Sequence, residues 1–405
     1  MMAAVSAHSK YGKSYATALG RTIQLSKRIS EMNRKYRTPC KLWALLLAVL
    51  LLVAGGAVSV GAAPQAQQPS KTMPDQVYVG GMPFGVKFYT EGILVVGFCD
   101  VDVTSGGGGT RNVNPAKNAG LKIRDVITAV NGKAPAGAAT LTKAVEESGG
   151  KPVTLTIKRV SHGSAISASK KVNEPQATEL TVSVTPAYSA SENRYKTGLW
   201  VRDSGAGIGT VTFIIPGSNA FAGLGHGICD GDTGDLIPMQ RGQVTDVTVS
   251  GIDKGEVGAP GAIKGYFAPG KTGSLLGNTE CGVYGIFASL PASAVDQLPI
   301  GTRRDVQEGE ATILCTLDNG KVGRYKIQIT SVDRDATGSK CFTISVTDPA
   351  LIQKTGGIVQ GMSGSPVIQN GKLVGAVTHV LINDPTCGYG IFIENMLKEM
   401  GSLAG

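Results

Sequence analysis

The sequence is poor in aromatic residues (5%) and in histidine, of which its 405 residues contain four. It has seven cysteines, but no two of them have the close spacing of a metal site or a redox pair. Outside residues 1–41 it has almost no net charge, with 30 basic and 29 acidic groups, although the whole chain carries +9. A nucleic-acid-binding protein would spread basic residues over a folded face, so this class is excluded. Free thiols, most of them buried, are expected for the cysteines.

Charged side chains are absent from residues 42–63, the run of 22 residues LWALLLAVLLLVAGGAVSVGAA. At about 1.5 Å per residue, such a helix crosses the hydrocarbon core of a bilayer once. Residues 1–41 hold nine Lys or Arg and one Glu, which predicts a cytoplasmic tail and a single-pass protein whose remainder is extracytoplasmic. A cleaved signal peptide is the alternative, because VSVGAA resembles a cleavage site. The length of the basic region favours an uncleaved anchor.

Glycine is abundant (56 residues), and Val, Ile and Thr recur in short runs, so the composition favours many short strands joined by tight turns. Residues 64–76 are rich in Pro, Gln and Ser and predict an extracytoplasmic linker. Over residues 187–405, runs such as YKIQITSV, CFTISV and LVGAVTHV follow one another with few helical segments between them. This pattern predicts a mainly β domain made of two barrels, with a C-terminal helix at IENMLKEMG.

Residues 77–186 have another pattern. NPAKNAGLKIRDVITAVNG combines a helical turn, a strand and an Asn-Gly turn, and LTKAVEESGG has helical spacing. Together with GMPFGVKF before them, these segments resemble a PDZ domain. The resemblance implies that a peptide binds as an added strand, with Gly85, Val86, Lys87 and Phe88 as the docking edge.

A serine nucleophile needs a base that takes its proton, an acid that orients the base, and amide donors for the oxyanion. Histidine limits the choice of base. His8 precedes the apolar run and His162 lies in a polar insertion, which leaves His226 and His379. His226 stands in FAGLGHGICDGDTGD, where a strand ends and glycines expose the backbone. This placement favours His226 as a site residue.

The segment GMSGSP, residues 361–366, resembles the nucleophile turn of trypsin-like proteases, and PVIQNGKLVGAVTHV resembles the strand, turn and strand that follow it there. The resemblance selects Ser363 as the nucleophile, with the amides of Gly361 and Ser363 converging on the oxyanion. Ser365 is the alternative nucleophile. In this fold the order along the chain is His, acid, Ser, so His226 is the expected base and His379 is expected to line the substrate pocket.

The acid must then lie between His226 and Ser363. Spacing alone does not choose among its candidates, which are Asp253, Asp296, Asp305, Asp318, Asp333, Asp335 and Asp348. Asp348 is favoured because it follows the strand-like run CFTISV. The acids of DGDTGD raise the alternative of a calcium loop, but the distal Glu of such loops is missing. No metal or cofactor is therefore expected.

Beyond these separate motifs, residues 75–400 resemble the SpoIVB peptidase family, on the segments LGHGICDGDTG and GGIVQGMSGSPVIQNGKLVGAVTHVLINDPTCGYGIFIE. The resemblance implies a triad of His226, Asp348 and Ser363. It also implies a membrane-anchored serine endopeptidase of sporulation signalling in the forespore intermembrane space, which cuts itself within the linker. Its protein substrate would be a SpoIVFA-like membrane regulator, whose cleavage activates intramembrane proteolysis of pro-sigma-K.

Two other functions fit parts of the same pattern. One is a non-catalytic PDZ adaptor with a protease-like domain, against which the intact set of His226, Asp348 and Ser363 argues. The other is a quality-control protease of the HtrA type, in which the PDZ domain follows the protease, whereas here the PDZ-like segment precedes it. In each case the PDZ domain is expected to bind a peptide or a protein terminus.

Overall fold

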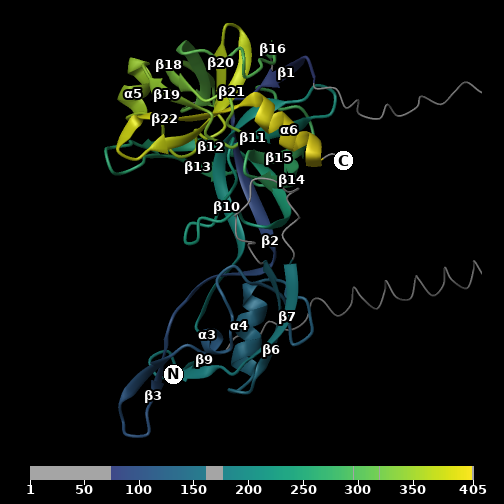
Figure 1. Cartoon of the computed structure of the whole chain (residues 1–405), viewed down its shortest axis with the longest axis vertical. Coiled ribbons are helices and arrows are strands. Elements are labelled where there is room, and N and C mark those ends of the chain that lie inside the picture. The colour runs from purple at the N-terminus through teal and green to yellow at the C-terminus, as the bar shows by residue number, and fades with distance from the viewer. Residues whose placement is uncertain (1–73, 161–176, 295, 319, 404–405) are drawn as a thin grey trace, which may run out of the picture. The chain divides into compact units, whose positions relative to one another are not determined.

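The computed structural model describes residues 74–160, 177–294, 296–318 and 320–403 of the chain (Figure 1). The predicted tail (1–41), the predicted anchor (42–63) and nearly all of the predicted linker (64–76) lie outside these residues. Among the described residues, no helix combines the length and the apolar character needed to cross a membrane.

The first structural unit is a closed barrel of antiparallel strands. Pairing of β2 with β10 closes the path β10-β11-β15-β14-β12-β2. Its strands are β2 (Pro83–Phe98), β10 (Leu199–Ile214), β11 (Ala220–Gly223), β12 (Met239–Asp253), β14 (Gly273–Thr279) and β15 (Gly282–Phe287). Three further strands extend this sheet: β1 (Gln76–Val79) pairs with β10, β16 (Gln297–Pro299) pairs with β1, and β13 (Ala262–Phe267) pairs with β12.

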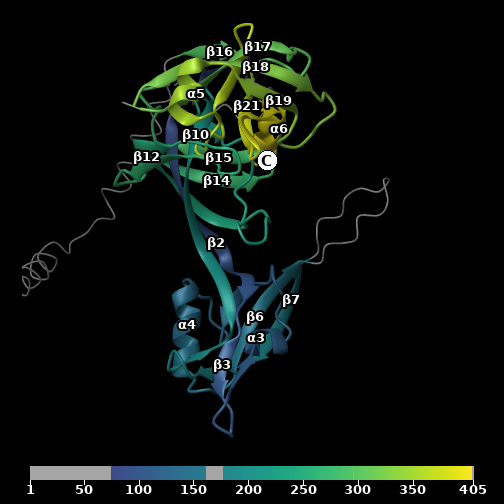
Figure 2. The same ribbon diagram turned by 90° about the vertical axis from the view of Figure 1, so that its left-hand side faces the viewer.

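A PDZ-like unit is inserted between the first two strands of this barrel. It contains the last part of β2 and the first part of β10, which run side by side as long continuous strands (Figures 1 and 2). Between them lie β3 (Val101–Thr104), β4 (Thr110–Val113), α3 (Pro115–Asn118), β5 (Val126–Val130), α4 (Ala138–Glu147), β6 (Val153–Val160), β7 (Ala177–Val184), β8 (Ala187–Ser189) and β9 (Arg194–Lys196). The burial pattern shows the change of unit within one strand: Phe84 and Val86 pack in the barrel core, whereas Ile93 and Val95 pack in the PDZ-like core.

This insertion corrects two predictions. The boundaries 77–186 and 187–405 do not follow the strands, because β1 and the first part of β2 belong to the barrel, and β8, β9 and the start of β10 contact the PDZ-like unit. The predicted docking edge, Gly85, Val86, Lys87 and Phe88, is wrong. These residues pair with β10 on one side and with β12 on the other, so neither edge is free to accept a peptide strand.

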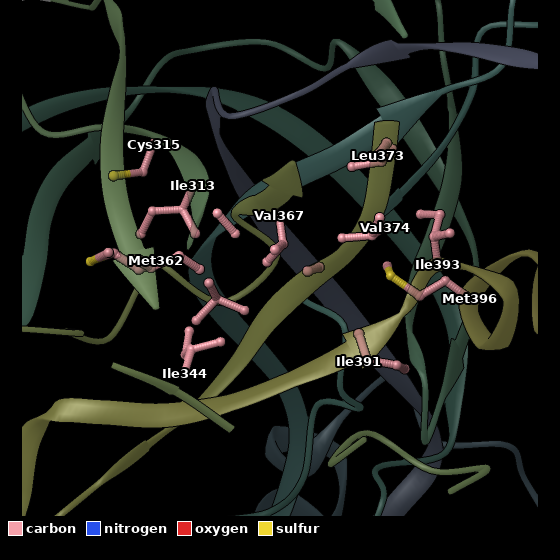
Figure 3. Packing of buried hydrophobic residues seen from close by; sticks show 14 of the residues in the cluster. Ile313, Cys315, Ile344, Met362, Val367, Leu373, Val374, Ile391, Ile393 and Met396 are labelled. Atoms are coloured by element: carbon pink, nitrogen blue, oxygen red, sulfur yellow. The ribbon is translucent and has the colours of Figure 1, made fainter. Parts of the chain in front are cut away.

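The second unit is a closed barrel in the order β17-β18-β19-β22-β21-β20. Its strands are β17 (Gly309–Thr316), β18 (Val322–Val332), β19 (Phe342–Val346), β20 (Pro366–Gln369), β21 (Lys372–Leu381) and β22 (Asp384–Phe392), with α5 (Pro349–Thr355) between β19 and β20. Aliphatic and sulfur-containing side chains fill its interior, among them Ile313, Met362 and Val367 (Figure 3). The prediction of a mainly β chain with two barrels is confirmed.

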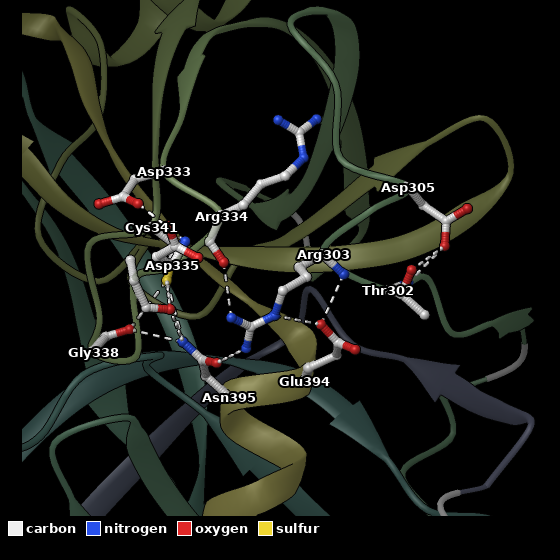
Figure 4. A network of polar contacts seen from close by, with 11 residues as sticks. Thr302, Arg303, Asp305, Asp333, Arg334, Asp335, Gly338, Cys341, Glu394 and Asn395 are labelled. Carbon is white, nitrogen blue, oxygen red and sulfur yellow. Dashed lines mark hydrogen bonds and ion pairs between the residues drawn. The ribbon is translucent and has the colours of Figure 1, made fainter.

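The C-terminal helix α6 (Ile393–Leu403) is also present as predicted. A polar network fixes its first turn (Figure 4). The Arg303 guanidinium donates to Glu394 Oε2 at 3.0 Å and to Asn395 Oδ1 at 3.0 Å, and the Asn395 amide donates to Cys341 Sγ at 3.3 Å. Cys341, Cys281 and Cys315 are buried, and all six cysteines of the described residues are free thiols.

Candidate active site

The segment with Ser363 forms a tight turn between α5 and β20. Met362 is fully buried and anchors the turn in the second barrel (Figure 3). Ser363, in contrast, is half-buried. Ser365 is fully buried, and its hydroxyl has no hydrogen-bond partner among the described residues. Because a nucleophile must reach its substrate, this burial favours Ser363 over Ser365.

Strand β10 of the first barrel holds the carbonyl groups of this turn. Thr210 donates from its amide to Ser363 O (2.9 Å) and from its hydroxyl to Gly361 O (2.7 Å). The hydroxyl of Thr212 donates to Gly364 O at 2.8 Å. Both threonines are at most 2% exposed. Strand β10 of the first barrel therefore holds the turn through its carbonyl oxygens, which act as acceptors. Backbone amides of the turn stay available as hydrogen-bond donors.

The amides of Gly361 and Ser363 are those donors. Within the described part of the chain, neither amide donates to a backbone or side-chain acceptor, whereas the amides of Met362 and Gly364 donate to Val359 O and Val377 O. A turn with two uncommitted amides beside a serine is the arrangement that stabilises a tetrahedral oxyanion. The residues predicted for this role are thus in a turn that suits it.

In this structure the hydroxyl of Ser363 donates to the backbone carbonyl of Thr378 at 2.8 Å. No hydrogen bond joins Ser363 to His226 within the described residues. Attack on a substrate therefore requires a rotation of the Ser363 side chain away from Thr378 O, toward a base.

His226 lies in the loop after β11, and this loop packs against β21. At Gly225 a Cβ would lie 2.9 Å from Thr378 Cγ2, so the backbone of this loop closely approaches the side chain of Thr378. The Nδ1 atom of His226 is 2.8 Å from Gly227 O. A carbonyl only accepts, so Nδ1 carries the proton and Nε2 has the free lone pair of a base. Burial lowers the pKa of His226 below its usual value, although the bond to Gly227 O opposes this shift.

His379 lies on β21 directly after Thr378, and its ring centroid is 4.9 Å from that of His226, with 38° between the ring planes. Burial, together with the smaller effects of His226 and Lys340, lowers the pKa of His379 to about 4. The structure therefore brings His226, His379 and Ser363 together beside β21, where the loop after β11 of the first barrel contacts the second barrel. The pocket role predicted for His379 stays a prediction.

Asp348 is not brought to this place by any interaction of the described residues. It is the N-cap of α5, with Pro349 as the first helical residue. Its Oδ1 accepts from the amides of Ala350 (3.0 Å) and Leu351 (3.2 Å), and its Oδ2 accepts from the amide of Lys326 (3.1 Å). Burial would raise the pKa of Asp348, but these amides hold it below its usual value. No hydrogen bond joins Asp348 to His226 among the described residues, so the role of Asp348 as the acid that orients His226 stays a prediction.

The acids of the loop after His226 do not form a calcium loop. Asp230 is buried and ion-paired with Arg202 Nε at 2.6 Å, and Asp232 lies 3.1 Å from the same guanidinium. Asp235 pairs with Arg124. Since each carboxylate has an arginine partner, the loop is held by ion pairs to β10 and to the PDZ-like unit.

A second candidate site is a groove of 160 Å³ in the PDZ-like unit, between α4 and the start of β10. Its apolar lining comes from Leu141 and Val145 on the helix and from Leu199 and Val201 on the strand. The start of β10 pairs with β2 along one edge, and the described strands leave its other edge unpaired. This edge, and not residues 85–88, can accept an added strand.

Sequence reasoning missed two features for identifiable reasons. The groove strand begins within the segment RYKTGLWV, residues 194–201, which lies after the predicted boundary and therefore in the predicted protease domain. The capping role of Asp348 had a clear signal, since TDPALIQKTG has Asp before a Pro at the first helical position and Gly at the end. No sequence signal predicted the contact between His226 and His379.

Comparison with known proteins gives two family matches. A model described as SpoIVB peptidase S55 matches residues 193–397, and a PDZ domain model matches residues 114–159. No curated protein matches the sequence.

Several solved structures resemble parts of the chain. The HtrA-type protease AlgW with a tripeptide is 14% identical over 49% of this chain and 56% of its own, with a TM-score of 0.30. The serine endoprotease from Yersinia pestis is 15% identical over 49% and 58%, with a TM-score of 0.28. Rv3671c from M. tuberculosis, in an inactive form, is 13% identical over 49% and 82%, with a TM-score of 0.26. The chain thus spans little more than half the length of the first two.

Proposed function

Since this chain belongs to the SpoIVB peptidase S55 family, we propose that it is a serine endopeptidase in which Ser363 attacks the substrate and His226 takes the serine proton. The observation that carries this proposal is the turn at residues 361–364, which presents a half-buried serine beside two uncommitted amides. His226 supports it, because its bond to Gly227 O leaves Nε2 as the basic nitrogen.

The reaction then follows from the contacts of the resting site. Ser363 leaves Thr378 O and passes its proton to His226 Nε2 as its oxygen attacks the peptide carbonyl. The amides of Gly361 and Ser363 stabilise the oxyanion, and protonated His226 gives its proton to the leaving amine. A water molecule, deprotonated by His226 in the same way, hydrolyses the acyl-enzyme.

As substrates we propose the chain's own N-terminal linker, residues 64–76, and a SpoIVFA-like membrane regulator in the forespore intermembrane space, whose loss releases processing of pro-sigma-K. The proposal of a single-pass anchor at 42–63 goes with it, since self-cleavage in the linker would free the catalytic part from the membrane. These assignments rest on the family and on the apolar run, which precedes the described residues.

The pH dependence of self-processing tests the proposed base. The full chain is incubated in detergent micelles between pH 4 and 8, and its products are identified by N-terminal sequencing. The base acts when neutral, so the rate is constant at high pH and falls as His226 becomes protonated. Because burial lowers the pKa of His226, the midpoint of this fall is expected below 6.5. A midpoint above 7, or no cleavage within the linker at any pH, would contradict the proposal.

For the PDZ-like unit we propose that the groove between α4 and β10 binds a protein terminus and thereby influences cleavage. One strand makes both contacts: Leu199 and Val201 of β10 line the groove, and Thr210 of the same strand holds the nucleophile turn. A peptide that pairs with the start of β10 would therefore stabilise the strand that positions Ser363.

The location of this groove can be tested by substitution. Thr142 lines it from an exposed position on α4, so Thr142→Trp should fill the groove without disturbing the core. We expect at least tenfold weaker binding, roughly 1.4 kcal/mol, of a peptide with a free apolar C-terminus selected on the wild-type chain, measured by fluorescence anisotropy. The matched control is Lys87→Ala in the barrel part of β2, which should leave binding unchanged. The opposite result would restore residues 85–88 as the docking edge.

The alternative of a non-catalytic adaptor is favoured by one observation, the hydrogen bond of Ser363 to Thr378 O in place of a bond to a base. An adaptor would bind the same peptide at the groove and would not cleave the linker, so the self-processing experiment separates the two functions.

A further inference from the structure

The peptide unit between Gln360 and Gly361 is held by its carbonyl group. The carbonyl of Gln360 accepts from the amide of Ile263, on β13, at 2.8 Å. No cis peptide bond occurs among the described residues, and in a trans peptide unit the C=O and the N–H point in opposite directions. The amide of Gly361 therefore points away from β13, and its direction depends on a strand that extends the sheet of the first barrel.

The other amide proposed for the oxyanion is directed from within the turn. The carbonyl of Met362 accepts from the amide of Ser365 at 2.9 Å. Because this carbonyl shares a peptide unit with the amide of Ser363, that amide points away from Ser365. Of the two donors, the amide of Gly361 is thus the one that is set by a contact outside the turn.

Gly361 does not fix the direction of its amide by its own sterics. Its φ is +97°, and glycine adopts positive and negative φ about equally readily. If the peptide unit rotated, the carbonyl oxygen of Gln360 would take the place of the amide of Gly361. An oxygen there would repel an oxyanion, because both carry negative charge. A productive turn therefore needs a partner that holds Gln360.

The β12–β13 hairpin is built to hold it. Four backbone hydrogen bonds of 2.8 Å join the hairpin to the second barrel: Gly255 N to Thr355 O, Gly258 N to Ile382 O, Gln360 N to Gly261 O and Ile263 N to Gln360 O. Two of the four use both backbone groups of Gln360, which forms a parallel bridge with Ala262. The side chain of Ile263 is 7% exposed and belongs to the same core cluster as Met362. The hairpin thus has little freedom to leave Gln360.

We propose that Ile263 is a positioning residue for the oxyanion site: its amide holds the carbonyl of Gln360 and thereby directs the amide of Gly361 to the oxyanion. This inference rests on the proposed function, because it concerns the same two amides. It gives the β12–β13 hairpin a role in the reaction that depends on one backbone N–H and not on the identity of a side chain.

The test compares Ile263→Pro with Ile263→Ala in the full chain. Both variants lose most of the buried side chain and keep its Cβ, but only Pro lacks the amide that donates to Gln360 O. This amide is not used in the pairing of Ile263 with Ile252, and β13 pairs with no strand other than β12 among the described residues. Pro is accepted at such positions of edge strands, so folding, checked by circular dichroism, should be retained.

The readout is the rate of labelling by a fluorophosphonate probe, whose phosphoryl oxygen needs the oxyanion donors in the transition state. Ile263→Ala should label within about threefold of the wild-type rate. The maximal rate of Ile263→Pro should be roughly 10²- to 10³-fold lower, the effect of losing one oxyanion donor. The probe concentration at half-maximal rate and the midpoint of the acid limb should match those of Ile263→Ala, because the donor acts in the transition state and His226 is unchanged.

If Ile263→Pro does not fold, an ester at residue 263 decides. It is made by translation with the α-hydroxy acid of isoleucine, which replaces the same N–H by oxygen and keeps the side chain. The ester should show the same loss of maximal rate relative to the wild type.

Three results would contradict this account. Equal rates for Ile263→Pro and Ile263→Ala, or an ester that labels like the wild type, would show that the amide has no role. An unchanged maximal rate with a higher probe concentration at half-maximal rate would make the hairpin part of substrate binding, which also overturns the inference. If the wild type is not labelled at all, the proposed function itself fails.

Discussion

Ser363→Ala is expected to abolish cleavage within residues 64–76, with a rate at least roughly 10⁴-fold below that of the wild type, because removal of a serine nucleophile from a triad-type site has effects of this size. Folding should be unchanged, since Ser363 is half-buried and, among the described residues, its side chain makes one hydrogen bond, the donation to Thr378 O. The measurement is gel analysis of the full chain in detergent micelles, followed by N-terminal sequencing.

The matched control is Ser365→Ala, two residues along the same turn. The hydroxyl of Ser365 is buried without a partner, so its removal should leave stability unchanged or improve it by about 1 kcal/mol and should keep the cleavage rate within a few-fold. If Ser365→Ala were inactive and Ser363→Ala processed itself in pure form, the assignment of the nucleophile would be reversed.

Gly364→Ala is expected to disrupt the nucleophile turn and to destabilise the protein. Gly364 has φ +94°, and a Cβ there would lie 2.0 Å from Thr210 O and 2.4 Å from Leu224 N. Both clashes are with backbone, so β10 or the loop before His226 must move. The left-handed conformation alone costs roughly 1–2 kcal/mol for a residue with a Cβ. With the clash, we expect the free energy of unfolding to fall by about 4 kcal/mol, a loss typical of the most damaging substitutions.

Gly371 provides the comparison, since it also has positive φ (+75°) but open space around its Cβ position. Gly371→Ala should cost only the conformational part, roughly 1–2 kcal/mol, and should keep self-processing. Denaturant unfolding and the cleavage assay on both variants separate strain from clash. Equal effects at the two positions would show that the contact between β10 and the nucleophile turn has little importance.

Much of the fold could be predicted because its signals are local. Short alternating runs with glycine turns gave the second barrel, and IENMLKEMG gave α6. The insertion of the PDZ-like unit could not be predicted in this way. Phe84 and Ile93 lie in one uninterrupted strand with one alternating pattern, and only the long-range pairing with β10 and β12 shows that they belong to different cores.

Part of the candidate site could also be predicted from local signals in the sequence. GMSGSP identified the turn, and the count of histidines led to His226 and His379. The capping role of Asp348 has a local signal that agrees with the geometry, whereas its role as the orienting acid stays a prediction. The contact between the two histidines depends on a bulge, which forms through the pairing of β21 with β22 and leaves no clear mark in the sequence.

The most direct measurement of the central claim is the location of a covalent label. The full chain is treated with a fluorophosphonate probe, digested, and analysed by tandem mass spectrometry, with His226→Ala treated in parallel. We predict one adduct, on Ser363, and its loss in His226→Ala, because the serine needs this base to react. An adduct on Ser365, or labelling of Ser363 that does not depend on His226, would contradict the account of this site.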